Sequence, residues 1–305
     1  MIDLHQDLYL YHSQPAFYPD NDQVSPEQIR ELNTKLIIAS AFCGPNSEEQ
    51  FGVSEMQMWQ DALDYYQKLS DFYLLTDSDQ LNDSKYSDKT GIIFHLEGIY
   101  QEVSISELDD WYQKGLRSIG LTWAEASPYA AGNNSPADSL TKAGAELITW
   151  CLDKGILVDL AHMSEKAFFE SAEIIDKPLF VSHANARLIC DNGYDRNLSD
   201  SQLRVIGESG GVVGIFFARS FVNNPTAVIG DVIRHIKHIV DIAGEDSIQI
   251  GSDFGGIISN PKISGLGRFS ELTNFKTMID ENFGTDFVEK LFYKNAERLM
   301  GVYLG

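Results

Sequence analysis

Side chains able to bind metal stand at the ends of several apolar runs in this 305-residue sequence. In the opening segment MIDLHQDL, Asp3, His5 and Asp7 occupy alternate positions, so on a β-strand they would share one face. Three polar groups on one face are costly to bury unless a partner satisfies them. Four later runs lead into similar side chains, which are Glu97 (HLEG), His162 (VDLAHMS), His183 (FVSHANAR) and Asp253 (IGSDFGG). These positions predict one site assembled from the ends of several strands.

The chemistry of these side chains indicates a metal centre. Imidazole and carboxylate donors without thiolate suit Zn²⁺ or a similar first-row divalent ion. Three histidines and two carboxylates are more donors than one catalytic zinc needs, since such a zinc keeps a position for water. The set suits two divalent ions about 3.5–4 Å apart that share a hydroxide as nucleophile. The predicted ligands are His5, Asp7, Glu97, His162 and His183, and Asp3 is expected to orient a ligand.

Alternating apolar runs and amphipathic stretches predict the elements that position these residues. Eight apolar runs are expected to be strands: MIDL at the start, and 35–42, 91–96, 116–123, 155–161, 177–182, 210–217 and 247–252. Helical patterns lie between them, notably at 54–73, 139–155 and 226–244. Runs that are apolar on both faces indicate a parallel sheet covered by helices. We therefore predict a single-domain (β/α)8 TIM-type barrel over 1–305, with extra C-terminal helices from about 268. A doubly wound open sheet is the alternative.

The composition excludes several classes of partner. Lys and Arg total 23 against 45 Asp and Glu, a net charge of −22, which disfavours nucleic acid and anionic membrane surfaces. Three cysteines without a CxxC pair predict neither a disulfide framework nor a thiolate zinc site. The N-terminus lacks a signal-peptide pattern, and no run has the apolar length of a membrane span. A cytoplasmic location is expected.

The motifs together resemble the renal (membrane) dipeptidase family of zinc peptidases, within the wider amidohydrolase-type barrels. The matching segments cover nearly the whole chain in family order: IDLHQDL, HLEGIY, LTWAEASPYAAG, GILVDLAHMSEKAF, PLFVSHANARLICDNGYDRNLSD, GGVVGIFF, IGSDFGG and YKNAERLM. The resemblance implies that His5 and Asp7 hold one metal, that His162 and His183 hold the other, and that Glu97 bridges both.

The resemblance also implies roles in substrate binding and catalysis. Arg196, in DRNLSD, matches the arginine that binds the free carboxylate of the dipeptide, a role that suits a guanidinium fork. Asp253 matches an aspartate that holds the substrate's amino group and carries a proton to the leaving amine. A bridging hydroxide would attack the carbonyl, and the catalytic residues would be Asp253 and Glu97. A homodimer is compatible with the resemblance.

The sequence departs from the family pattern at two positions. Where familiar members have LTH, this chain has Trp123. That histidine helps to stabilise the oxyanion, whereas an indole can donate one hydrogen bond but cannot become charged. Loss of such a donor can cost roughly 2.7–4 kcal/mol of transition-state stabilisation, and Trp123 could instead shape a substrate side-chain pocket. The usual DFDG is DFGG here, so at Gly255 we expect a changed loop and no loss of metal.

Other chemistry-bearing residues are given structural interpretations. His95 lies on the same strand face as Glu97 and is expected to pack or to support the site. His235 and His238 lie on the outer helix, and we expect them to be exposed or hydrogen-bonded. His12 could border the pocket. Arg187 is the competitor of Arg196 for the substrate carboxylate, but its place suggests the turn after a strand.

Three functions remain open from the sequence. The first is a metal-dependent dipeptidase, including action on dipeptides with a D-residue at the carboxyl side. The second is a dinuclear hydrolase of another small carboxylate-bearing amide or lactone. The third is a catalytically silent barrel that acts as a binding protein, against which the complete ligand set argues because buried charge without function destabilises a fold.

Overall fold

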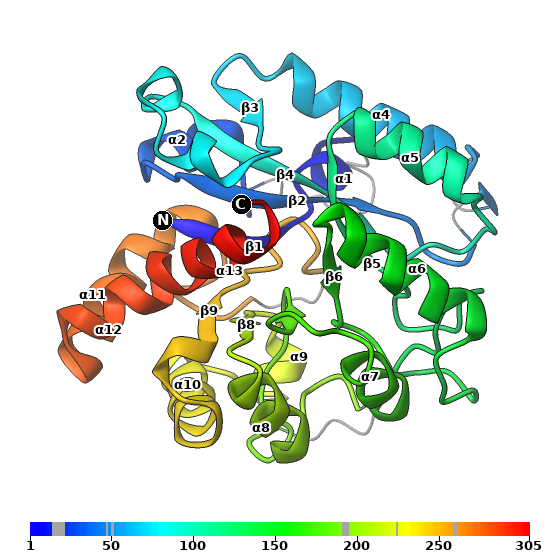
Figure 1. Ribbon diagram of the computed structural model, residues 1–305. Helices are drawn as coiled ribbons and strands as arrows, with labels where there is room; N and C mark the ends of the chain where they lie inside the picture. The colour runs from blue at the N-terminus through cyan, green and yellow to red at the C-terminus, as the bar shows by residue number, and fades with distance from the viewer. Residues whose placement is uncertain (14–21, 47, 50–51, 191–194, 224, 259–261) are drawn as a thin grey trace.

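The computed structural model describes residues 1–13, 22–46, 48–49, 52–190, 195–223, 225–258 and 262–305. Within these residues, eight parallel strands form a nearly closed barrel with helices around it (Figure 1). The strands, in their order around the sheet, are β1 (Ile2–Gln6), β2 (Leu36–Phe42), β4 (Thr90–Glu97), β5 (Leu116–Gly120), β6 (Leu157–Asp159), β7 (Phe180–Val181), β8 (Val212–Ile215) and β9 (Ile248–Ile250). The predicted (β/α)8 barrel is thereby confirmed, and the open sheet is wrong.

The barrel closes between its first and last strands. The peptide N–H of Asp253 donates to the carbonyl of His5 at 3.1 Å, and that of Asp7 donates to the carbonyl of Phe254, also at 3.1 Å. Gln6 and Phe254 form an isolated parallel bridge at the same place. Residues at the ends of the first and last barrel strands are therefore held side by side.

Helices on the outside of the barrel separate successive strands. They are α4 (Glu55–Lys68), α5 (Ile105–Gln113), α6 (Lys142–Lys154), α7 (Glu165–Ala172), α8 (Asp200–Glu208) and α10 (Ile229–Ala243). Side chains at Ser54, Ser104, Thr141, Ser164 and Ser199 each accept a hydrogen bond from the first turn, as N-caps do. At the end of α6, Gly155 adopts a left-handed conformation with φ of 69°.

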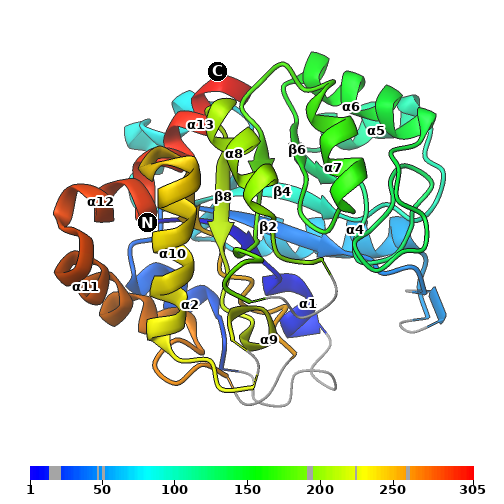
Figure 2. The ribbon, with the colours of Figure 1, turned by 90° about the horizontal axis from the view of Figure 1, so that it is seen from below.

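Further helices complete the chain. At the C-terminal ends of the strands lie α1 (Leu8–Ser13) and α9 (Arg219–Val222), while α2 (Pro26–Glu31) precedes β2. The predicted C-terminal helices are α11 (Leu272–Phe283), α12 (Thr285–Glu289), a π-helical turn (Lys290–Lys294) and α13 (Asn295–Tyr303). Figure 2 shows α13 at one end of the barrel and α1 and α9 at the other.

One strand was not predicted. The helical pattern at 54–73 ends at Lys68, and Phe72–Leu74 forms β3, which pairs with β4 beside the barrel path. Phe72, Tyr73 and Leu74 continue an aromatic-rich amphipathic stretch, so periodicity alone does not separate them from the helix.

The barrel interior is apolar at one end and polar at the other. Ile93, His95 and Glu97 alternate along β4 and share one face. Ile93 belongs to an apolar cluster with Leu157 and with Leu299 of α13. Apolar packing against α13 thus fills the N-terminal end, and the polar side chains of the strands gather at the C-terminal end.

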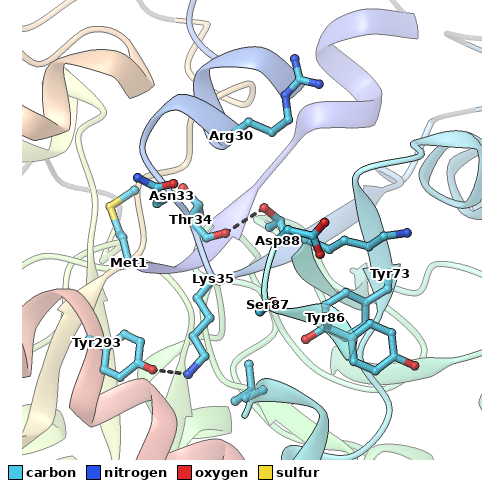
Figure 3. A pocket seen from close by; sticks show the side chains of 13 residues that line it. Met1, Arg30, Asn33, Thr34, Lys35, Tyr73, Tyr86, Ser87, Asp88 and Tyr293 are labelled. Carbon is cyan, nitrogen blue, oxygen red and sulfur yellow. Dashed lines mark hydrogen bonds between the residues drawn. The ribbon is translucent and has the colours of Figure 1, made fainter. Parts of the chain in front are cut away.

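A small cavity of about 360 Å³ lies beside the start of β2, away from this polar end (Figure 3). Lys35, in its wall, donates hydrogen bonds to the hydroxyl of Tyr293 and, at 3.1 Å, to Oε1 of Glu297. These bonds link the start of β2 to the C-terminal helices. None of the residues that line this cavity in the described chain was predicted to belong to the site, and this face of a TIM barrel ordinarily serves stability.

Candidate active site

The predicted site residues meet in one large cavity at the C-terminal end of the barrel. The cavity has a volume of about 1030 Å³. The predicted residues in its wall are Asp7, Glu97, Trp123, His162, His183, Arg196 and Asp253. His5 is fully buried and contacts the cluster from within. The prediction that five separate strands contribute to one site therefore agrees with their placement.

Glu97 lies at the centre of the metal-capable side chains. Its Oε2 is 3.2 Å from Nε2 of His5, and its Oε1 is 3.4 Å from Nε2 of His162 and 3.9 Å from Nε2 of His183. The two carboxylate oxygens therefore face two different groups of donors. Asp7 adds to the first group, because its Oδ2 is 3.5 Å from Nε2 of His5.

The donors fit divalent metal ions. His5, Asp7 and Glu97 each offer an atom within 4.8 Å of the others, and so do Glu97, His162 and His183. Within the described residues, Nε2 of His5 and Oδ1 of Asp7 are buried without a hydrogen-bond partner. Nitrogen and oxygen donors in such groups are the ligands that zinc and related ions take.

Electrostatics favour the metal-binding form at three groups of the cluster, Glu97, His162 and His183. Burial raises the pKa of Glu97, but His5 and His162 outweigh it and hold that pKa well below its usual range. Burial, followed by the charge of Arg196, lowers the pKa of His162 to about 4. Burial, with His5 next, also lowers the pKa of His183 well below the usual value. Glu97 is therefore ionised, and the imidazoles of His162 and His183 are neutral, as ligands must be. Burial lowers the pKa of His5, but Glu97 and Asp7 outweigh it and raise that pKa well above its usual value, so His5 must release a proton when it binds a metal ion.

Arg196 brings a buried positive charge to the cavity wall. Its side chain is 5% exposed, and its guanidinium lies 4.9 Å from the ring centroid of Phe216. Nη2 donates to the carbonyl oxygen of His183 at 2.8 Å, whereas Nη1 has no hydrogen-bond partner among the described residues. Burial lowers the pKa of Arg196 to about 10, so the group stays charged at neutral pH. The open nitrogen is a donor for an anionic ligand group.

Asp253 is held in an uncommon backbone conformation next to the metal-capable cluster. Its φ is 61°, which only a few per cent of non-glycine residues adopt. Burial raises its pKa well above the usual value, although His5 opposes this effect. Gly256 lies against it, because a Cβ atom there would overlap Oδ1 of Asp253 and Oδ2 of Asp7. Gly255 has a φ of 95°, which glycine adopts freely, so the DFGG sequence suits this tight loop.

Trp123 forms one side of the cavity. Its ring packs edge-on against Phe42 with centroids 5.2 Å apart and lies 5.8 Å from the ring of His162. Its peptide N–H donates to Oη of Tyr100 at 3.0 Å. Tyr100 is in turn fixed by Glu55, whose carboxylate accepts the peptide N–H groups of Tyr100 and Gln101, each at 2.9 Å. Trp123 therefore lies beside the metal-capable groups on a loop that these hydrogen bonds hold in place.

Two charged residues that competed for site roles lie elsewhere. Arg187 donates to Oε2 of Glu165 at 2.7 Å and to the carbonyl of Asn197. His238 pairs with Asp200 at 2.7 Å on the outside of the barrel. Arg196 lines the cavity and Arg187 does not, and His238 is hydrogen-bonded, as the sequence led us to expect.

The remaining histidines are buried or peripheral. His235 is fully buried and contacts the carbonyl of Val222 at 2.8 Å and the peptide N–H of Ala186 at 3.1 Å. His12 stacks with Tyr65 and does not line the cavity. His95 lies directly below the site, where its Nδ1 is 2.9 Å from the hydroxyl of Ser118.

Sequence reasoning missed one buried carboxylate in this region. Asp159, at the end of β6, lies within 4.8 Å of the donors of His5 and His183. A signal for it was present, because VDLAH at 158–162 repeats the arrangement of IDLH at 2–5, with an aspartate shortly before a histidine.

Comparison with known proteins decides the family. The sequence profile of the membrane dipeptidase family, peptidase family M19, matches residues 1–302. The chain belongs to this family. An uncharacterized protein from the pqqA 5′ region of Klebsiella pneumoniae is 34% identical over 206 residues, 64% of this chain and 74% of that protein. In three other curated relatives, the aligned part is between 46% and 64% of the relative's length.

Solved structures of metallopeptidases share the fold. A metallopeptidase described as dipeptidase AC superimposes with a TM-score of 0.83 at 23% identity, over 100% of this chain and 98% of that one. A metallopeptidase from Rhodobacter sphaeroides, bound to a phosphinate mimic of L-Ala-D-Ala, gives 0.83 at 22% identity, over 99% and 98%. At these identities the likeness establishes the barrel of the M19 dipeptidases. No helix in the described part of this chain has the length and apolar character of a membrane span.

Proposed function

We propose that this M19 family member is a metal-dependent dipeptidase that hydrolyses small dipeptides in the large cavity. The observation that carries the proposal is the buried, unpaired Nη1 of Arg196, a residue that lines the same cavity as the metal-capable cluster. A fixed cation beside a hydrolytic centre selects a short substrate whose carboxylate lies close to the bond that is cleaved. A dipeptide meets this requirement, whereas the interior of a long peptide does not.

Two groups of side chains would hold the metal ions. His5 and Asp7 would bind one ion, His162 and His183 the other, and Glu97 would contact both through its two oxygens. Zn²⁺ suits these donors. When bound, the ions lower the pKa of a coordinated water to near neutrality and polarise the scissile carbonyl.

Asp253 would hold the amino group of the substrate and carry a proton to the leaving amine. Apart from the proposed ligands, the carboxylates that line the cavity in the described chain are Asp253 and Glu125. Burial raises the pKa of Asp253, and nearby divalent ions would lower it again. The carboxyl is therefore suited both to accept a proton and to deliver it to the departing nitrogen.

We also propose that the part of the cavity that binds the C-terminal residue of the dipeptide accepts a D-amino acid. The related Rhodobacter sphaeroides enzyme binds a mimic of L-Ala-D-Ala. In this chain Arg196 would bind the carboxylate through its unpaired Nη1, and the wide cavity would accept the neighbouring side chain in either direction.

The presence of Trp123 supports a second candidate function, the hydrolysis of another carboxylate-bearing amide or lactone. Its indole stands where familiar members have a histidine, so oxyanion stabilisation differs from theirs. Arg196 and the metal-capable cluster would act in the same way on an N-acyl amino acid.

A substrate panel tests the proposal. Protein purified without chelator and supplied with Zn²⁺ would be assayed with L-Ala-L-Ala, L-Ala-D-Ala, N-acetyl-alanine and a small lactone. We expect turnover of the dipeptides and its near-complete loss in Asp253→Asn. Asp246→Asn is the matched control, since Asp246 pairs with Lys290 on the surface. Turnover of N-acetyl-alanine alone would favour the second candidate, and no turnover of any compound would contradict both.

A further inference from the structure

Two buried aspartates outside the proposed ligand set are arranged in the same way around the site. Asp159 ends β6 and Asp3 lies on β1, and both are almost completely inaccessible to solvent. Each reaches across to the serine that directly precedes a functional residue on a neighbouring strand. Ser182 precedes His183, and Ser252 precedes Asp253.

The two contacts have matching geometry. Oδ1 of Asp159 accepts the peptide N–H of Ser182 at 2.8 Å, and its Oδ2 accepts the serine hydroxyl at 2.5 Å. Oδ1 of Asp3 accepts the peptide N–H of Ser252 at 2.8 Å, and its Oδ2 accepts that hydroxyl at 2.5 Å. The peptide N–H and the hydroxyl of each serine therefore donate to the same carboxylate.

Each aspartate also holds a second functional residue. Oδ1 of Asp159 accepts the peptide N–H of Ala161 at 3.0 Å, immediately before His162. His162 has a φ of 65°, so its position depends on such restraints. Asp159 thus fixes the residues before both histidines of one proposed metal site.

Asp3 has the corresponding place at the other site. Its Oδ1 accepts the peptide N–H of His5 at 3.4 Å, and Gln6 donates to its Oδ2 at 2.9 Å. Because Ser252 belongs to the segment after β9, the contact also fixes the seam where the barrel closes. Asp3 therefore restrains His5 and the backbone of Asp253.

On the Asp159 side the contact continues to a ligand ring. The hydroxyl of Ser182 is 2.7 Å from Nδ1 of His183. Since that hydroxyl donates to Asp159, it accepts the Nδ1 proton, which leaves the lone pair of Nε2 toward Glu97 and His162. Asp159 could itself be a ligand by proximity, but its two oxygens already accept three hydrogen bonds.

We propose that Asp159 and Asp3 are positioning residues, each dedicated to one metal site. Asp159 preorganises the His162–His183 site, and Asp3 preorganises the site of His5 and Asp7. The inference rests on the proposed two-metal function. Groups that orient ligands in this way typically contribute 10- to 100-fold to metal affinity, and here each contribution is confined to its own ion.

Zn²⁺ titration of single-site backgrounds tests the assignment. His5→Asn retains the His162–His183 site, and His162→Asn retains the site of His5 and Asp7. Asp159→Asn and Asp3→Asn are added to each background, and Zn²⁺ dissociation constants are measured by competition with a chromophoric chelator. We expect Asp159→Asn to weaken the His162–His183 site about 10- to 100-fold and the other site less than threefold. Asp3→Asn should show the reverse pattern.

Two further variants separate positioning from folding. Asp231→Asn is the matched control, because Asp231 is a buried carboxylate that binds the start of α10 away from the site. It should alter thermal unfolding without changing Zn²⁺ affinity. Ser182→Ala keeps Asp159 and removes only the relay to His183, so it should weaken the same site as Asp159→Asn even if that variant folds poorly.

The outcomes distinguish the inference from the proposed function. If Asp159→Asn weakens both sites equally, or leaves Zn²⁺ affinity unchanged, the positioning inference is overturned. Zn²⁺ binding by the wild-type protein would still support the proposed metal centre. Site-selective weakening without turnover of any dipeptide would support the inference and contradict the proposed substrate. Wild-type protein that binds no Zn²⁺ would overturn both.

Discussion

Replacing Arg196 by glutamine should impair hydrolysis of dipeptides with a free carboxylate far more than hydrolysis of the same dipeptides capped as amides. The guanidinium is buried, Nη2 already donates to His183, and Nη1 is the open donor. The substrate carboxylate therefore gains one charge-assisted hydrogen bond from this side chain, in a place where water cannot substitute for it.

The expected loss follows from that geometry. A hydrogen bond to a charged group contributes about 1.5–3 kcal/mol, and truncating one partner of a buried charge pair costs about 2–5 kcal/mol. The ranges overlap at about 2–3 kcal/mol, which corresponds to roughly a 30- to 150-fold fall in kcat/KM. A capped dipeptide has no carboxylate to lose, so its kcat/KM should change less than about threefold.

The assay compares L-Ala-D-Ala with its C-terminal amide in wild-type protein and Arg196→Gln, with bound metal measured in both. Arg117→Gln is the matched control, since Arg117 is partly buried and, like Arg196, donates to a main-chain carbonyl, here those of Thr76 and Tyr112. An equal loss on both substrates, with metal content unchanged, would refute the assigned role of Arg196.

Three further predictions concern the surroundings of the site. Burial raises the pKa of Glu55 to about 7, so the folded protein retains a proton that the unfolded chain releases near pH 4.5. Its contribution to the free energy of unfolding should therefore fall by about 3 kcal/mol between pH 4.5 and 7. Denaturant unfolding should show this fall in wild-type protein relative to Glu55→Gln. Parallel pH profiles of the two proteins would contradict the prediction. Trp123→Ala should lower kcat/KM for dipeptides with an aromatic side chain by about 2- to 13-fold relative to L-Ala-D-Ala, since an aromatic pair contributes about 0.5–1.5 kcal/mol. Phe72→Ala, which is distant from the cavity, is the control variant. An unchanged ratio of kcat/KM between the two substrates would exclude Trp123 from the side-chain pocket. Removing metal with a chelator should lower the free energy of unfolding by about 4 kcal/mol per ion present at 1,000 times its dissociation constant, and thermal scans with and without Zn²⁺ that coincide would argue against a metal centre in the folded state.

The arrangement of elements was accessible from the sequence because the strands are buried on both faces. Apolar runs such as 91–96 stand out from amphipathic stretches, and the residues at their C-terminal ends converge in any parallel barrel. Glu97 and His183 could therefore be assigned to one site from their positions alone. The pairing of Arg196 with that site came from family resemblance, because a residue in a long connection has no fixed direction in a strand pattern.

The supporting contacts were less accessible because they join segments far apart in the chain. Asp3 was recognised as an orienting group, but its partner Ser252 lies across the seam of the closed barrel. Asp159 lies on an apolar run, and nothing local shows that it reaches Ser182. Glu55 has the sequence features of an ordinary first-turn helix residue, and its role emerges only when the loop carrying Tyr100 docks against α4.

The central claim is that five side chains at the ends of four strands bind two divalent ions. Elemental analysis of protein purified without chelator tests it most directly, with Glu97→Gln measured in parallel, since Glu97 faces both groups of donors. The account predicts about two divalent ions per chain in the active wild-type protein and a clear loss of bound metal in Glu97→Gln. An active protein without stoichiometric metal, or a Glu97→Gln variant with full metal content, would contradict it.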